Sequence, residues 1–224
     1  LEWLRARLCR IKGYQELTAP VELRITATSA EYDKQIPGTP TGGWTGIDYS
    51  IVDAERCGTG ANGIMVAQHE CAHFFLLFRA LPRNPVEFGW DPYTWMSEAF
   101  PAYCYFPSPE HPVDGGDYWK TMNGYYAHSP KALEQVTNGE NVLGDLMKTP
   151  SDSYNESQRG QQYVAGSILA MYALEHPDIC EKYMRFLADV YTGKAKKDAF
   201  ETHLGPPADV SKKMAAWLKT LPEK

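Results

Sequence analysis

Two histidines and a glutamate interrupt an otherwise apolar stretch, Val66 to Phe78, in the order H-E-x-x-H. In a helix, His69 and His73 lie four residues apart and project from one face, about one turn from each other. This spacing allows both imidazoles to bind one Zn²⁺ at about 2.0–2.1 Å. Glu70 lies about 100° further around the axis, where its carboxylate can take a proton from a water held by the metal. The pattern therefore predicts a metal centre that activates water.

The same residues allow a second interpretation, a buried helix whose histidines are satisfied by hydrogen bonds inside a protein core. Burying the three polar side chains without partners would cost about 1–3 kcal/mol for each group. A metal ion removes that cost for all of them at once. The segment from Ile64 to Leu81 contains neither Pro nor Gly, which favours the helix that both interpretations require.

Glu98 is the candidate for the third protein ligand that a catalytic zinc site needs besides an open position for water. It lies on the next expected helix, residues 95–103. Two helices joined by a connection of this size can pack together, which would bring Glu98 over the face that carries both histidines. A surface carboxylate near a helix N-terminus is the alternative, since carboxylates are common there.

These motifs together resemble those of the gluzincin metallopeptidases, the clan that contains thermolysin and the aminopeptidase N family. The segment Trp95-Met96-Ser97-Glu98-Ala99-Phe100 is similar to the W-x-x-E-G-F/L-A box that carries the glutamate ligand in that clan. Peptidase MA-like domains have a similar box at variable distance from the zinc helix. The resemblance implies a zinc-dependent peptidase in which His69, His73 and Glu98 bind Zn²⁺. It also implies that Glu70 is the general base.

A third segment, Gln162 to Tyr172, is similar to the Y-x-K-G-apolar helix of the aminopeptidase N family. The tyrosine of that helix hydrogen-bonds the oxyanion of the tetrahedral intermediate, and the resemblance implies this role for Tyr163. A donor aimed at developing negative charge contributes roughly 3–4 kcal/mol to lowering the barrier. The alternative is a core tyrosine on an amphipathic helix, one of 14 tyrosines in the chain.

The chain departs from the family pattern at several positions. Gly60 to Val66 contains no counterpart of the G-x-M-E-N glutamate that binds the substrate's amino group, which favours an endopeptidase over an aminopeptidase. Ala99 replaces the usual glycine, and Pro101 falls within the expected helix. Ala102 stands where thermolysin-like enzymes have an aspartate, so the acceptors that orient the zinc-binding histidines must come from elsewhere.

The spacing of apolar residues predicts a mixed α+β chain, and the resemblance implies one zincin-like domain over residues 1–224. Residues 1–80 form a strand-rich lobe with a small N-terminal β-sheet and the active-site helix, and residues 81–224 form a mainly helical lobe. From Tyr118 onward the pattern is helical throughout. Helices are expected at 1–15, 64–81, 95–103, 161–176, 179–191, 195–203 and 208–221, strands at 21–27 and 44–53, a Gly-rich connection at 56–63, and loops at 37–43, 81–92 and 107–116.

One of these strands is a candidate for substrate binding. In gluzincins an edge strand above the zinc helix pairs with extended peptide substrate. The resemblance implies this role for the strand at 44–53, in which Ile47, Tyr49 and Ile51 share one face. An ordinary strand of a core hairpin is the alternative.

Composition sets limits on the partners of this chain of 224 residues, of which 43% are hydrophobic and 22% charged. A formal net charge of −6 without a Lys/Arg stripe argues against nucleic acid as the main partner. No apolar segment reaches the roughly 20 residues that span a bilayer. Five cysteines without C-x-x-C spacing specify neither a disulfide framework nor a thiolate metal site. The chain begins without Met, which suggests a processed form or part of a longer protein.

The resemblance implies a peptide or protein substrate as the partner. A secreted or periplasmic location is favoured, although nothing in the residues fixes the compartment. Three other functions stay open: a zincin-fold binding module without activity, an aminopeptidase, and a metal-dependent hydrolase of non-peptide bonds. The remaining histidines are expected to be solvated and not catalytic; they are His111, His128, His176 and His203.

Overall fold

The structure is a computed structural model that describes residues 6, 9, 20–46, 48–58, 61–74, 93, 95–104, 129–149, 155–191 and 193–221. Within these segments the protein is mixed α+β and mostly helical, with one small sheet, which confirms the predicted class at that level. Of the helix predicted at 1–15, only Ala6 and Cys9 lie inside the described residues. The predicted loops at 81–92 and 107–116 and the stretch 118–128 lie outside them.

The sheet has three strands in the order β1-β3-β2: β1 (Glu22–Thr26), β2 (Gly43–Thr45) and β3 (Tyr49–Asp53). β1 runs parallel to β3, and β2 runs antiparallel to it with Trp44 opposite Ile51. The prediction of a single strand over 44–53 is therefore wrong. The chain reverses after Thr45, where the Gly46 N–H donates to the Tyr49 carbonyl at 3.0 Å. The apolar residues Ile47, Tyr49 and Ile51 alternate across the end of this turn, so the pattern did not reveal it.

One face of the sheet is covered by α2 (Ser29–Gln35), a helix that the sequence analysis did not predict. Thr28 and Glu31 form a capping box at its N-terminus, which satisfies backbone N–H groups that the helix leaves without partners. Tyr32 of α2 is fully buried against Ile51 of β3. This small apolar cluster fixes the sheet on the side away from the candidate site.

The other face of the sheet is covered by α4 (Ala61–His73), which carries the H-E-x-x-H residues. The helix begins three residues earlier than predicted, and the part of the prediction beyond Phe74 lies outside the described residues. A short helix, α3 (Ala54–Cys57), overlaps the start of the Gly-rich connection predicted at 56–63, and α4 begins within its end. Inside α4 the chain requires glycine at Gly63, because a Cβ there would collide with the carbonyl oxygen of Gly58.

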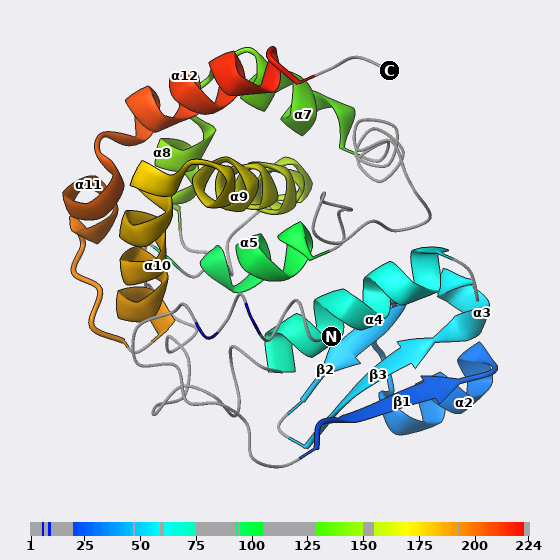
Figure 1. The fold of residues 1–224 in the computed structure, drawn as a ribbon. Coiled ribbons are helices and arrows are strands. Elements are labelled where there is room, and N and C mark those ends of the chain that lie inside the picture. Colours follow the sequence, from blue (N-terminus) through cyan, green and yellow to red (C-terminus); the bar gives the residue numbers. More distant parts are fainter. Residues whose placement is uncertain are drawn as a thin grey trace.

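Beyond α4 the regular elements that the structure describes are helices, and they form successive layers. Figure 1 shows α4 between the sheet and α5, with α9 packed on the opposite side of α5. None of the described helices is long and apolar enough to cross a membrane. The helices of this half are α5 (Met96–Tyr103), α7 (Pro130–Thr137), α8 (Val142–Leu146), α9 (Glu156–Glu175), α10 (Pro177–Tyr191), α11 (Ala199–Leu204) and α12 (Pro207–Leu218).

Helix α9 is the centre of the helical half. It begins at Glu156, five residues before the predicted start, because Asn155 and Gln158 form a capping box there. Residues 164–174 are buried along nearly their whole circumference, and the helix contacts α5, α7, α8, α10 and α12. A helix buried on all sides is held in a fixed position by its neighbours. It can therefore place side chains at its exposed end accurately.

Candidate active site

Three ligand atoms from two helices converge on one point. The Nε2 atoms of His69 and His73 lie 2.9 Å apart, and Glu98 Oε2 lies 3.3 Å from the first and 3.2 Å from the second. A tetrahedral zinc ion with ligands at about 2.0–2.1 Å separates them by about 3.3 Å. The three measured edges come close to that value, so the residues present fit a zinc ion. Among the described residues, no other group of three or more His, Cys, Asp or Glu could hold a metal.

The three ligands are shielded from solvent to different degrees. The side chains of His69 and His73 are 4% and 11% exposed, and that of Glu98 is 23% exposed. Two largely buried imidazoles and a carboxylate face one another, so much of their polar surface is removed from water. A bound cation would compensate for that lost hydration. Glu98 also lines the cavity.

The charges of the site shift the proton affinities of two of its ligands in opposite directions. Burial alone would lower the pKa of His73, but the negative charge and hydrogen bond of Glu98 raise it above 6.5. Burial alone would raise the pKa of Glu98, but the charge of His73 and hydrogen bonds from both imidazoles hold it well below 4.5. In the metal-free protein, a proton on His73 therefore offsets the negative charge of Glu98, as a bound cation would.

This arrangement predicts how zinc stabilises the protein at different pH. The His73–Glu98 pair contributes stability that is fully present between pH 4.5 and 6.5 and is lost as pH rises through the raised pKa of His73. Zinc binds only the deprotonated imidazole and gains affinity over the same range. The rise in melting temperature caused by zinc should therefore grow from about pH 5 to about pH 8.

Thermal unfolding of chelated and zinc-loaded protein at each pH measures this difference. A His73→Ala protein is the control, and its melting temperature should respond weakly to zinc at every pH. A zinc effect that stays constant or shrinks as pH rises would contradict the assignment of these ligands.

The close approach of α5 to α9 places Glu98 beside Tyr163. A Cβ at Gly166 of α9 would lie 2.6 Å from the Cβ of Ala99, so only glycine allows this contact. The Gln162 Nε2 also donates to the Trp95 carbonyl at the start of α5, at 3.3 Å. Glycine on the facing helix therefore lets the two helices pack closely at Ala99.

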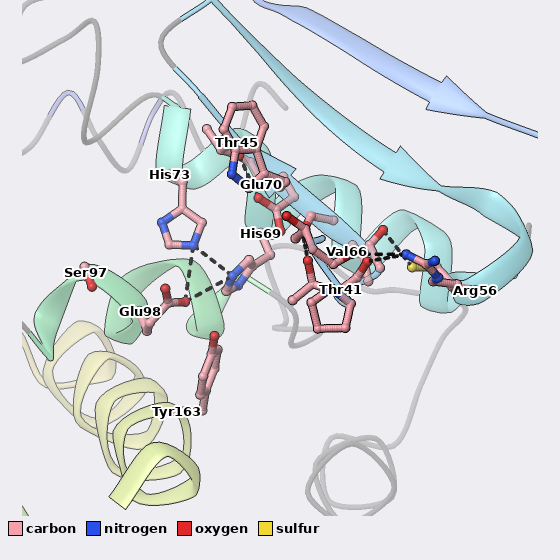
Figure 2. A pocket seen from close by; sticks show the side chains of 16 residues that line it. Thr41, Thr45, Arg56, Val66, His69, Glu70, His73, Ser97, Glu98 and Tyr163 are labelled. Carbon is pink, nitrogen blue, oxygen red and sulfur yellow. Dashed lines mark hydrogen bonds and ion pairs between the residues drawn. The ribbon is translucent and has the colours of Figure 1, made fainter. Parts of the chain in front are cut away.

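Tyr163 lies at the edge of the metal-binding group. Its ring is nearly parallel to that of His69, with an interplanar angle of 21° and centroids 6.1 Å apart. Figure 2 shows the side chain rising from α9 with its hydroxyl toward His69 and Glu98. A phenol in this place can donate a hydrogen bond to an oxygen bound at the centre.

Glu70 projects from α4 toward the sheet and lines the same cavity as the three ligands. Its carboxylate Oε2 accepts a hydrogen bond from Thr45 Oγ1 of β2 at 2.7 Å. The structure thus brings all five predicted site residues together, four of them on α4 and α5 and the fifth on α9. Thr45 was not singled out by the sequence analysis, since nothing in its local pattern indicates which helix residue it meets.

A cavity of about 710 Å³ joins these residues to the edge of the sheet. Strand β2 forms one wall, and backbone hydrogen bonds to the β3 side flank it at Gly42 and Gly46, with Trp44 opposite Ile51 between them. Because such bonds alternate along an antiparallel strand, the backbone groups of Gly43 and Thr45 point away from β3. The cavity is lined by Thr39, Pro40, Thr41, Gly42, Gly43, Trp44, Thr45, Arg56, Cys57, Val66, His69, Glu70, His73, Ser97, Glu98 and Tyr163.

Arg56 fixes the segment that leads into β2. Its guanidinium forms a bidentate pair with Asp33, at 2.8 and 3.0 Å, and donates to the carbonyls of Thr39 and Thr41. The Arg56 Nε also lies 3.2 Å from the buried carboxylate of Asp53. Burial would raise the pKa of Asp53, but hydrogen bonds from neighbouring groups and the charge of Arg56 hold it below its usual value. The cavity wall is therefore held by buried and charge-assisted bonds.

Several other histidines and cysteines lie away from this centre. His176 bonds the Tyr172 carbonyl, and His203 pairs with Asp189 at 2.9 Å. Cys71 is buried, and burial raises the pKa of its thiol to about 11, as expected for a core cysteine. His111 and His128 lie outside the described residues. No disulfide joins the cysteines at 9, 57, 71, 104 and 180.

Thermolysin-like enzymes use an aspartate to orient a zinc-binding histidine. Among the described residues, none takes that role for His73. The Nδ1 atom of His73 is buried without a hydrogen-bond partner among the described residues. Such acceptors normally fix the ring orientation of a metal-binding histidine. The His73 ring meets that of His69 edge to face, with the ring centroids 4.5 Å apart, and its Nε2 lies 3.2 Å from Glu98 Oε2.

Comparison of the chain with protein-family models, with curated proteins and with solved structures returns no match. The resemblance to the gluzincins consequently rests on the sequence motifs alone.

Proposed function

We propose that this protein is a zinc-dependent peptidase of the gluzincin type, with a zincin-like arrangement of sheet, active-site helix and helical half. One observation carries the proposal. The Nε2 atoms of His69 and His73 and the Oε2 atom of Glu98 lie within 3.3 Å of one another, in a cavity that Glu70 and Tyr163 also line. Separate segments of the sequence bring a proposed ligand set, base and oxyanion donor into one cavity. A chance motif in a core helix does not explain this convergence.

In the proposed mechanism, His69, His73 and Glu98 hold the metal. Zinc, when bound, supplies a Lewis acid that lowers the pKa of water and polarises a carbonyl group. Glu70 takes a proton from the attacking water and returns it to the leaving amine. The Tyr163 phenol donates a hydrogen bond to the substrate oxygen as negative charge develops on it.

The cavity favours cleavage within a chain over removal of a terminal residue. Among the described lining residues, Glu70 and Glu98 are the only carboxylates, and both already have roles, so no third one is available for a substrate ammonium. Arg56 is the only lining Lys or Arg in this set and is engaged by Asp33, so it does not offer a site for a terminal carboxylate. The outward backbone groups of β2 suit an extended peptide that adds to the sheet edge.

Incubation of the zinc-loaded protein with a denatured protein, with and without chelator, tests the proposal. We expect internal fragments by mass spectrometry, loss of cleavage on chelation, and recovery when zinc is restored. A peptide blocked at both ends should still be cut. A folded, zinc-loaded protein that cleaves nothing would exclude the peptidase and favour a binding module, whereas release of single N-terminal residues would favour an aminopeptidase.

The role of Tyr163 predicts a separate effect on turnover. The Tyr163→Phe change removes only the hydroxyl and should lower kcat about 10²- to 10³-fold, as loss of one oxyanion donor does elsewhere. The KM for a fluorogenic peptide and the zinc content should change little. Tyr172→Phe, on the same helix but packed against Trp217, is the control and should keep the wild-type kcat. Equal kcat values for the two variants would remove Tyr163 from the mechanism.

A further inference from the structure

The carboxylate of Glu70 is in direct contact with the edge strand of the sheet. Thr45 Oγ1 lies 2.7 Å from Glu70 Oε2 and 2.9 Å from the Glu70 carbonyl oxygen. It also lies 3.1 Å from Ser50 Oγ, the residue opposite on β3. Two hydroxyls of neighbouring strands thus meet one residue of α4.

The number of hydroxyl protons decides which group donates to which acceptor. A hydroxyl has one proton to donate. The Ser50 hydroxyl donates to the Glu70 carbonyl at 3.1 Å, which satisfies that oxygen. The Thr45 proton can therefore go to the carboxylate, where a charged acceptor gives the stronger bond. Ser50 holds the backbone of Glu70, and Thr45 holds its side chain.

Gly43, two residues before Thr45 on β2, limits the space around the same carboxylate. A Cβ at Gly43 would lie 2.6 Å from Glu70 Oε1 and 2.8 Å from a methyl carbon of Val66. Only glycine therefore allows the strand to approach α4 this closely. Gly43 and Thr45, which share one face of β2, enclose the carboxylate between a bare backbone and a hydroxyl donor.

We infer that Thr45 is the positioning residue for the general base, holding the Glu70 carboxylate in place by a hydrogen bond to Oε2. This role rests on the proposed function, because it has a purpose only if Glu70 transfers a proton. A carboxylate on a flexible side chain samples several rotamers. A hydrogen bond that holds one of its two oxygens removes most of them. Since Thr45 belongs to the strand that forms the cavity wall, the base is held in a fixed place relative to a peptide on that strand.

The test compares Thr45→Val, which keeps the shape and removes the hydroxyl, with Thr45→Ser, which keeps the hydroxyl. We expect Thr45→Val to lower kcat about 10- to 100-fold, the cost of one charge-assisted hydrogen bond, with KM and zinc content unchanged. Thr45→Ser should stay within about threefold of wild type. Thr26→Val is the control, because Thr26 bonds a backbone carbonyl in the same sheet but does not line the cavity.

The outcomes separate this inference from the function on which it rests. If the wild-type, zinc-loaded protein hydrolyses nothing, both are overturned. If wild type is active and Thr45→Val keeps its kcat, only the role of Thr45 is overturned, and the same holds if Thr45→Ser is as impaired as Thr45→Val. Should the Thr45→Val protein fail to fold, Thr45→Ala takes its place in the comparison with Thr45→Ser.

Discussion

Replacement of Glu70 by Gln is expected to leave one zinc ion per chain and to lower kcat by about 10²- to 10⁴-fold, the usual contribution of a general acid–base group. The amide has nearly the shape of the carboxylate, and its oxygen can still accept the hydrogen bond from Thr45. It cannot take a proton from water. The loss should therefore appear in kcat and not in metal binding, measured by peptide hydrolysis and elemental analysis of the same sample.

A matched variant shows whether the effect belongs to this carboxylate. Glu134 of α7 does not line the cavity, so Glu134→Gln should keep wild-type kcat and zinc. A zinc-loaded Glu70→Gln protein with a tenth or more of the wild-type kcat would rule out Glu70 as the base. The metal site would then need another explanation.

Replacement of Glu98 by Gln is expected to weaken zinc binding by more than about 100-fold, since even the partners that only orient ligands contribute 10- to 100-fold. The substituted amide would offer a neutral oxygen in place of a charged one that lies 3.2–3.3 Å from both imidazole nitrogens. Removal of that charge also removes the group that raises the pKa of His73. Competition with a chromophoric chelator measures the affinity, and activity should disappear with the metal.

This variant separates the two interpretations of Glu98 that its sequence context allowed. A surface carboxylate at a helix start would have no influence on zinc, so Glu98→Gln would then bind zinc as wild type does. Glu134→Gln again serves as the control for loss of a negative charge elsewhere. Unchanged zinc affinity in a folded Glu98→Gln protein would remove the third ligand from the site.

The residues that could be predicted from sequence are those whose positions depend on one helix. His69, Glu70 and His73 are fixed relative to one another by helical geometry, so their spacing alone gives their arrangement in α4. Glu98 was harder, because its meeting with His73 depends on how α5 packs on α4. The place of α5 depends in turn on Gly166 and Ala99, which are far apart in the sequence and make contact between α9 and α5.

The parts that were missed depend on contacts between strands and helices. The alternation of Ile47, Tyr49 and Ile51 continues across the turn between β2 and β3, so the hairpin could not be distinguished from one long strand. Thr45 looks like any strand threonine until β2 is placed against α4. The short helix α2 was not predicted because only one of its residues, Tyr32, is buried, and a single apolar position gives no helical periodicity.

Diffraction from crystals of the zinc-loaded protein, recorded on both sides of the zinc absorption edge, tests the central claim most directly. The account predicts a single anomalous peak about 2.0–2.1 Å from the Nε2 atoms of His69 and His73 and about 2.0–2.2 Å from a carboxylate oxygen of Glu98. The fourth side of the ion should open to the cavity. A peak elsewhere, or a Glu98 side chain turned away from an ion held by other ligands, would contradict it.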